Sequence, residues 1–174
     1  LSGADAANYT FSGATGNYTV SQKSLTGSIT NGSSVYGAAL APGTASITSG
    51  IVGSDQVSPG TVTVNTAGNT STSGNLKAGT YTGIQSVGST LSGADATNYT
   101  FAGTTGNYTV TPLTLAGVLG AGSSVYGASL VPSVVTFSNK VGSDIVTAAT
   151  PTINTTGNTS TSGNLKAGTY TGIQ

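Results

Sequence analysis

The chain has 174 residues, no Cys, Met, Trp or His, and only four Lys and four Asp as charged residues, so its formal net charge is zero. It therefore has neither the basic stripe that nucleic acid requires nor an acidic excess. Disulfides and thiolate metal sites are excluded, and no apolar run reaches the roughly 18 residues of a membrane span.

Self-similarity sets the organisation of the chain. LSGADAANYTF at the start returns as LSGADATNYTF at position 91, and NGSSVYGAAL at position 31 returns as AGSSVYGASL, each 90 residues later. NTSTSGNLKAGTYTGIQ also occurs twice, 89 residues apart. A fixed period of this length indicates homologous modules of about 90 residues rather than a low-complexity tract.

The predicted elements are strands and turns. Ser and Thr make up about a third of the residues and 27 are Gly, which favours strands and turns over helices. Alternating runs at 18–20, 61–64 and 136–138 predict short strands between turn signals such as ATGN, SPG and TTGN. About six or seven strands fit in one period, so the predicted fold class is all-β, with tandem small β-sandwich modules joined end to end.

One proline indicates where two modules join. Pro112 follows NYTVT and precedes LTLAG. Proline fixes its own backbone angle and restricts the residue before it. We therefore expect a stiff crossing from one module to the next over residues 108–117.

Five motifs carry a family resemblance: VYGAAL, VGSD, AGTYTGI, LSGADATNYTF and GNYTVTPLTL, in this order. Together they resemble the MBG and YDG repeats of large bacterial surface adhesins, the filamentous haemagglutinin-like exoproteins, over the whole chain. VYGAAL and VYGASL lack the Asp of VYDG, which leaves the choice between the two families open. The resemblance implies Ig-like or MBG-like stalk modules of an extracellular adhesin or filament at the bacterial surface, with no enzymatic activity.

The register of these repeats divides the chain. It predicts a complete module at 23–112, the closing strands of a preceding module at 1–22, and a second module at 113–174 that lacks its closing strands. We expect the chain to be a window on a longer array whose partners are neighbouring copies of the repeat, head to tail. Residues 1–22 would complete a module that matches 113–174, in a continuous array or by strand addition from another chain.

No catalytic, cofactor or metal site is predicted. Without His, Cys, Glu or Arg, acid–base chemistry could fall only to Asp, Lys or Tyr, and neither a Ser-His-Asp arrangement nor a His-bearing metal site can form. Two Asp per unit are few for a calcium site. Asp5, Asp55, Asp95 and Asp144 are therefore interpreted as residues that close Asx turns.

Two pairs of residues are candidates for modification. Lys77 and Lys166 occupy the same place in GNLKAGTY, where a buried Lys beside Asn or Asp could form an isopeptide crosslink and an exposed Lys would guard an edge strand. Asn69 and Asn158 begin NTS in a turn-like segment and are candidate glycosylation sites.

The eight tyrosines leave one alternative function open. They recur at matching places in the repeats and are interpreted as core residues. An exposed row of tyrosines would instead form a stacking platform for host or matrix glycans. The alternative to a structural stalk is therefore a glycan- or protein-binding adhesive module.

Overall fold

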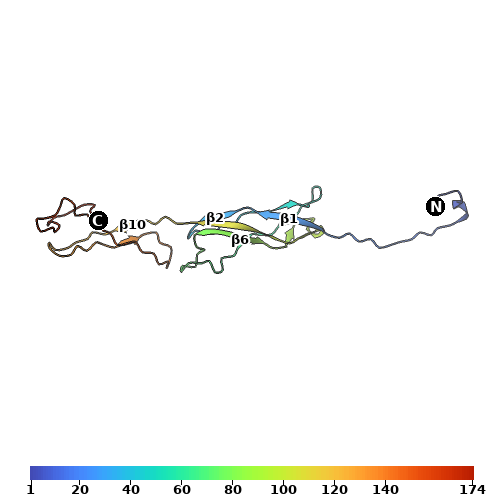
Figure 1. Ribbon diagram of the computed structural model, residues 1–174. Helices are drawn as coiled ribbons and strands as arrows, with labels where there is room; N and C mark the ends of the chain where they lie inside the picture. Colours follow the sequence, from blue (N-terminus) through green and yellow to red (C-terminus); the bar gives the residue numbers. More distant parts are fainter.

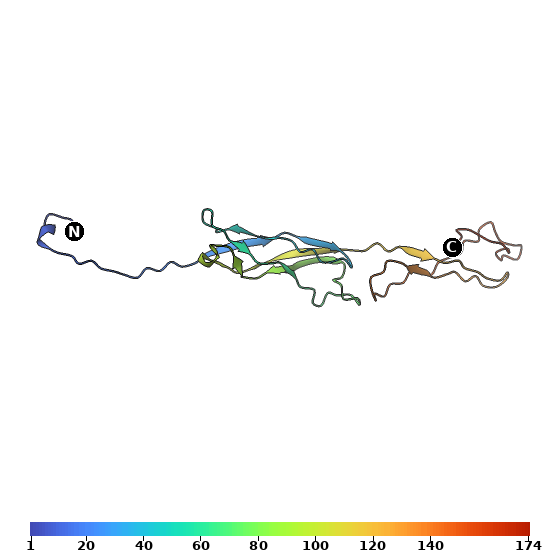
Figure 2. The same cartoon turned by 180° about the vertical axis from the view of Figure 1, so that it is seen from behind.

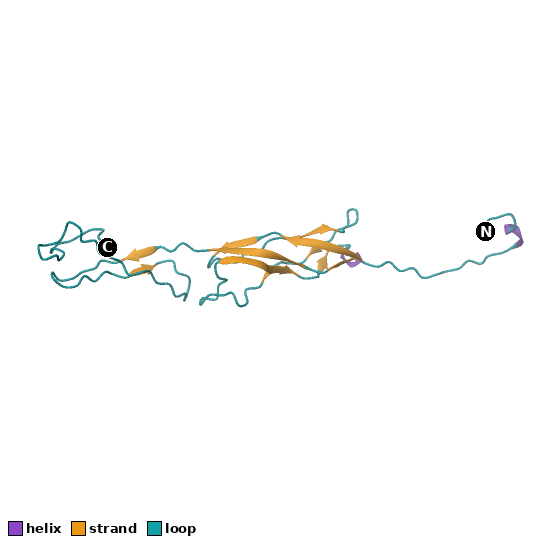
Figure 3. Ribbon diagram, in the orientation of Figure 1, coloured by secondary structure: helices purple, strands orange, loops and turns teal.

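The computed structural model describes all residues from Leu1 to Gln174 and is elongated (Figure 1). An extended N-terminal tail, a central body of strands and a C-terminal part with few strands follow one another along the long axis (Figures 1 and 2). Helices are limited to two 3₁₀ turns, which confirms the prediction of a β-rich chain (Figure 3). Neither turn has the length or the apolar character of a membrane-spanning helix.

The body contains nine strands, most of which lie in two sheets. One sheet has the order β3-β1-β8 and the other β2-β9-β6-β5, while β4 and β7 form a separate pair. The strands are β1 (Lys23–Ile29), β2 (Gly32–Val35), β3 (Ala45–Ser49), β4 (Ser58–Pro59), β5 (Thr63–Val64), β6 (Gly79–Val87), β7 (Leu91–Ser92), β8 (Tyr99–Phe101) and β9 (Thr104–Thr111). The strand predicted at 61–64 forms as β5, although it is shorter than its alternating run. The sequence predicts six or seven strands per repeat because β4 and β7, with two residues each, are too short to show an alternating pattern.

Parallel pairing ties the first strands of the body to its last ones. β8 runs parallel to β1, with Lys23 opposite Tyr99, and β9 runs parallel to β2, with Gly32 opposite Tyr108. β9 also pairs antiparallel with β6 on its other side. Residues 91–111, which form β7, β8 and β9, therefore complete both sheets, and we call them the closing strands.

Two clusters of buried apolar side chains form the core of the body. The larger contains Leu25, Ile29, Val57, Val87, Tyr99 and Phe101, and the smaller Leu76, Tyr108 and Val110. Burial of one such side chain contributes about 1.5–3 kcal/mol to stability. Four of the nine lie on β8 and β9, so the closing strands supply much of the core.

A glycine allows β2 to lie against the ring of Tyr108. A Cβ at Gly32 would lie 2.6 Å from Cδ2 of Tyr108 and 2.8 Å from the carbonyl oxygen of Ala41. No side chain fits at that distance. The smaller core cluster therefore depends on Gly at this position of the repeat.

A buried glutamine satisfies backbone groups between the strands. Gln85 on β6 is fully buried. Its Oε1 accepts a hydrogen bond from the N–H of Gly43 (2.6 Å), and its Nε2 donates to the carbonyl oxygens of Thr30 (3.1 Å) and Asn107 (2.5 Å). One side chain thus joins the segment after β1, the segment before β3 and the closing strand β9.

Residues 113–174 repeat the sequence of the body but form only two strands, β10 (Gly117–Leu119) and β11 (Val135–Phe137). β10 and β11 pair antiparallel, as β1 and β3 do in the body, and β11 confirms the strand predicted near 136–138. The segments that match β2 and β6, the two neighbours of β9, form no strand. No apolar side chain of this second repeat is buried.

The tail at residues 1–22 contains η1 (Ala6–Asn8) and no strand. The strand predicted at 18–20 is therefore wrong, although the matching residues 108–110 lie in β9. Tyr9 is 71% exposed where its counterpart Tyr99 is 4% exposed. The same contrast holds for three further pairs: Phe11 and Phe101, Tyr18 and Tyr108, and Val20 and Val110. These tail side chains have the sequence of core residues and no core around them.

Candidate functional site at the joint and in the second repeat

A serine-rich loop folds in the same way in both repeats. In the loop between β5 and β6, the N–H of Ser71 donates to the carbonyl oxygen of Asn75 (2.8 Å). In the second repeat the N–H of Ser160 donates to the carbonyl oxygen of Asn164, also at 2.8 Å. Because the second repeat lacks regular sheet here, the loop geometry depends on its own sequence and not on flanking strands.

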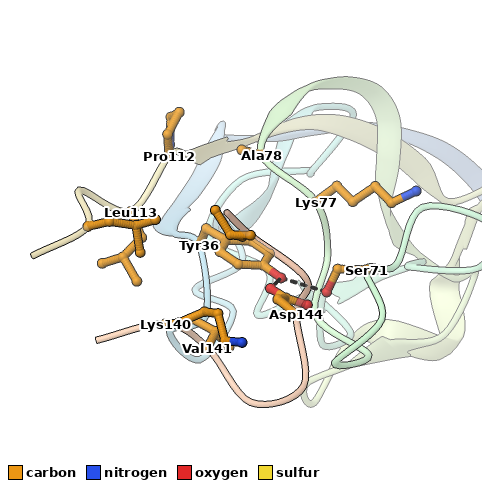
Figure 4. Close-up of a pocket in the computed structure, with 11 residues that line it drawn as sticks. Tyr36, Ser71, Lys77, Ala78, Pro112, Leu113, Lys140, Val141 and Asp144 are labelled. Carbon is orange, nitrogen blue, oxygen red and sulfur yellow. Dashed lines mark hydrogen bonds between the residues drawn. The ribbon is translucent and has the colours of Figure 1, made fainter. Parts of the chain in front are cut away.

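Asp144 of the second repeat binds this loop of the body. Its Oδ1 accepts hydrogen bonds from the backbone N–H (3.1 Å) and the hydroxyl (2.8 Å) of Ser73. Its Oδ2 accepts a hydrogen bond from the hydroxyl of Tyr36, which also lies 2.6 Å from Oγ of Ser71 (Figure 4). The carboxyl group is buried, so it joins the two repeats by hydrogen bonds shielded from water.

The electrostatics of the joint follow from these donors. The hydrogen bond from Tyr36, and after it the one from Ser73, lower the pKa of Asp144 below its ordinary value of 3.8, although desolvation acts in the opposite direction. The carboxylate is therefore ionised at neutral pH. Hydrogen bonds to an ionised acceptor are stronger than those between neutral groups.

A cavity of about 290 Å³ lies beside this contact. Residues 108–111 of the predicted crossing lie in β9, and Pro112 directly follows that strand. The stiffness of the crossing stays a prediction. The lining includes Pro112, Leu113 and Leu115 from the crossing, Val141 and Val146 from the second repeat, and Lys77 and Lys140 (Figure 4). The joint thus combines an apolar contact around the crossing with a polar contact at Asp144.

A matching cluster at the far end of the second repeat has no aspartate. The hydroxyl of Tyr126 lies 3.0 Å from Oγ of Ser160 and 3.4 Å from Oγ of Ser162. These two serines, in that order of importance, lower the pKa of Tyr126 below its ordinary value. The hydroxyl groups are therefore arranged as in the joint.

A groove of about 770 Å³ runs through the second repeat. Its lining comes mainly from residues 121–131 and 163–174, with Ile153 and Thr155. These segments match β2 with the loop after it and β6, the strands that flank β9 in the body. The groove therefore corresponds in position to β9.

Both candidate glycosylation sites lie in the serine-rich loops. Asn69 and Asn158 are half-buried, and the Nδ2 atom of Asn69 lies 3.4 Å from the carbonyl oxygen of Ala67. The Nδ2 atom of Asn158 lies 3.5 Å from the carbonyl oxygen of Thr156. Their placement in loops agrees with the sequence pattern, and their glycosylation stays a prediction.

The two repeat lysines are not buried in an apolar core. Lys77 is exposed and lines the cavity at the joint, and Lys166 is exposed in the second repeat. The structure therefore places neither lysine in the buried environment that an isopeptide crosslink needs. The role of these lysines in guarding an edge strand stays a prediction.

The interpretation of the aspartates as closing Asx turns is wrong. The Asp5 side chain makes no hydrogen bond to its turn, and the other three carboxyl groups bind elsewhere. Asp55 accepts a hydrogen bond from the hydroxyl of Tyr99 (2.6 Å), which raises the pKa of that tyrosine, and Asp95 accepts one from the N–H of Gln56 (2.8 Å). Asp144 binds across the joint. In each case the donor is far away in sequence, so the local pattern gives no sign of it. No three acidic side chains come together as a group of metal ligands.

Sequence reasoning missed Tyr36, Ser71 and Ser73. Each lies in a motif that occurs in both repeats, VYGA or NTSTSGN, and this recurrence is the one signal that could have selected them. Tyr36 is half-buried in the joint, while Tyr99 and Tyr108 are buried in the core. The tyrosines therefore do not form one exposed row.

Comparison of the chain with known protein families, with curated proteins and with solved structures finds no match.

Proposed function

We propose that the chain consists of structural repeats from a stalk or filament of a bacterial extracellular adhesin, which act in cell-surface extension, adhesion or biofilm assembly. The observation that carries this proposal is the joint at which Asp144 binds Tyr36 and Ser73. The two repeats lie end to end along one axis (Figure 1). Each added repeat therefore lengthens the molecule, which is the property that a stalk requires.

The proposal includes the finer architecture. Each repeat is a small β-sandwich of about 90 residues, with one complete module at 23–112. The module at 113–174 is completed by closing strands whose sequence matches residues 1–22. Residues 1–22 themselves are the closing strands of the module that precedes 23–112. The exposed core-type side chains of the tail and the open groove of the second repeat support this division.

Neighbouring repeats join by insertion of a strand. Residues 14–21 match β9, and the groove between 121–131 and 163–174 corresponds in position to β9. A strand in this groove would pair on both sides, and Tyr18 and Val20 would fill the core as Tyr108 and Val110 do. This contact is head-to-tail and does not close, so it builds a fibre. In a continuous array the strand is the last part of the same repeat, as residues 91–111 are in the body. Otherwise a neighbouring chain donates it.

The proposal assigns the chain no catalytic activity and an extracellular place at the bacterial surface. Its polar surface consists of hydroxyl and amide groups rather than charges. Asp144, Tyr36 and Ser73 direct their polar atoms toward one another across the joint. Their role in the proposal is to hold repeats together.

The test is assembly of the full chain, measured by sedimentation velocity over a concentration series and by electron microscopy. We expect end-to-end oligomers or thin unbranched filaments. Tyr18→Asp places a charge where the inserted strand must enter the core, and should weaken association by at least about tenfold. Thr15→Asp is the matched control, because it adds the same charge at a position whose counterpart Thr105 is exposed. A chain that stays monomeric at all concentrations would contradict the proposal.

A further inference from the structure

Two clusters of hydroxyl groups in the chain have the same internal geometry. The body cluster consists of Tyr36, Ser71, Ser73 and Asn75, and the terminal cluster of Tyr126, Ser160, Ser162 and Asn164. The tyrosine hydroxyl lies 2.6 Å from the first serine in the body cluster and 3.0 Å in the terminal one. The two serine hydroxyls are 3.1 Å and 3.0 Å apart, and the Asn Nδ2 lies 3.1 Å and 3.2 Å from the second serine.

Only the body cluster is occupied. It holds the carboxylate of Asp144, and Val141 of the same turn packs on Gly37, where a Cβ would lie 2.5 Å from Cγ2 of Val141. At Gly127, the counterpart of Gly37, an added Cβ would meet nothing within 4 Å. The terminal cluster is thus preformed and open, and it has space for the same turn.

The chain carries a second copy of the turn that fills this site. Val52–Asp55 has the sequence VGSD of Val141–Asp144, and the N–H of the aspartate donates to the carbonyl oxygen of the valine at 3.1 Å in both. Val52 is 53% exposed, and Asp55 binds Tyr99 through Oδ2, which leaves Oδ1 without a hydrogen bond. Because Tyr99 belongs to the closing strand β8, this turn lies at the end of the body opposite the joint.

We propose that the terminal cluster binds the Val52–Asp55 turn of a second copy of this chain, with Asp55 in the place that Asp144 takes in the body cluster. The inference rests on the proposed head-to-tail assembly and adds a second contact to it. At the joint within the chain, the closing strands are followed along the sequence by the Val141–Asp144 turn, which binds the body cluster. In the second copy, residues 14–21 are followed in the same way by the Val52–Asp55 turn. When residues 14–21 enter the groove, this turn therefore reaches the terminal cluster.

The aspartate then links three segments. Asp55 holds the closing strand of its own repeat through Tyr99, and its free Oδ1 binds the serine loop of the repeat before. Tyr9 of the inserted tail matches Tyr99, so it would hold Asp144 in the same way. Each joint is therefore coupled to the closure of the repeat that follows it.

Cysteine crosslinking tests this contact directly, because the chain has no Cys of its own. One sample carries Asp55→Cys and the other Ser162→Cys, and the two are mixed and oxidised. We expect a crosslinked dimer in the mixture well above the level in either sample alone. Ser73→Cys with Asp144→Cys in one chain is the positive control. Ser73→Cys mixed with Ser162→Cys is the negative control, because Ser73 is already occupied in the joint.

A second measurement uses a variant that folds without question. Tyr126→Phe removes only a hydroxyl from an exposed side chain, and should weaken association by about tenfold through the loss of a hydrogen bond to a carboxylate. Tyr81→Phe removes the same group outside the cluster, where it contacts the carbonyl oxygen of Lys77, and should leave association unchanged.

The outcomes separate this inference from the proposed function. In one outcome the chain associates and Tyr18→Asp prevents association, while Asp55→Cys and Ser162→Cys give no crosslink and Tyr126→Phe has no effect. In that outcome strand insertion stands and the aspartate contact is wrong. If the chain does not associate at any concentration, both fall. A crosslink in the mixture together with the effect of Tyr126→Phe supports the contact.

Discussion

Tyr108 and Tyr18 stand at the same position of the repeat, yet Tyr108 is fully buried and Tyr18 is 91% exposed. The hydroxyl of Tyr108 accepts a hydrogen bond from the N–H of Ala41 (2.8 Å), and its ring lies against Gly32. The two residues are in segments of nearly identical sequence. Their different burial therefore comes from the strands around them, β2 and β6, and not from local sequence.

Truncation of the two tyrosines should have opposite consequences for the isolated chain. Tyr108→Ala removes a fully buried ring, and we expect a loss of about 3–5 kcal/mol in the free energy of unfolding of the body. Tyr18→Ala should change it by less than about 0.5 kcal/mol, because the side chain is solvated. Urea denaturation at a protein concentration below that of association measures both. Equal losses would contradict the assignment of the core.

The glycine of β2 gives a second matched pair. Gly32→Ala places a Cβ 2.6 Å from the ring of Tyr108 and 2.8 Å from a backbone oxygen, so we expect a loss of about 1–3 kcal/mol from overpacking. Gly122→Ala, its counterpart, meets only the flexible end of Gln174 and should cost much less. The midpoints of thermal unfolding of the two variants test this. A neutral Gly32→Ala would show that β2 does not lie against the ring.

Gln85 should be sensitive to loss of its amide. Gln85→Leu keeps most of the volume but removes the side-chain partner of the N–H of Gly43 and of two carbonyl oxygens. An unsatisfied buried polar group costs about 1–3 kcal/mol, so a loss of at least about 2 kcal/mol is expected. Gln174→Leu is the control, because Gln174 is exposed and its Oε1 accepts from the N–H of Ser133 alone. Chemical denaturation that finds the two variants equal would argue against this network.

The joint should loosen in acid. The folded-state pKa of Asp144 lies below its unfolded value of 3.8, so its contribution is present above about pH 3.8 and is lost as the pH falls through the folded pKa. We expect the distance distribution between labels on the two repeats to broaden below pH 3.8, measured by fluorescence energy transfer. Asp144→Asn should remove this pH dependence. A distribution that is constant from neutral pH to acid in the unmodified chain would count against the ionised contact.

A strand predicted from alternation forms only where a partner strand is present. The alternation of Tyr18-Thr19-Val20 equals that of residues 108–110, and both predict a strand. β9 forms because β2 and β6 flank it, whereas the tail has no neighbour. Periodicity reports which face a strand would bury, and it does not report whether another strand lies within hydrogen-bonding distance.

The joint could not be predicted because its groups come from three separate motifs. Asp144, Tyr36 and Ser73 lie in VGSD, VYGA and NTSTSGN, and each motif by itself indicates a turn or a strand end. Their meeting depends on the crossing at Pro112 and on how the second repeat rotates against the body. The sequence placed the crossing around Pro112, but residue types alone do not give the rotation.

The parallel pairing of β1 with β8 determines how the body responds to mechanical force. Tension along the chain enters at Lys23, the first residue of β1, and leaves at Thr111, after β8 has led into β9. The two strands are then drawn in opposite directions along their own axes. The backbone hydrogen bonds run across the strands, so the force shears all bonds of the pair at the same time. The bonds do not break one after another from one end. A body closed in this way resists extension along the direction in which a stalk is pulled.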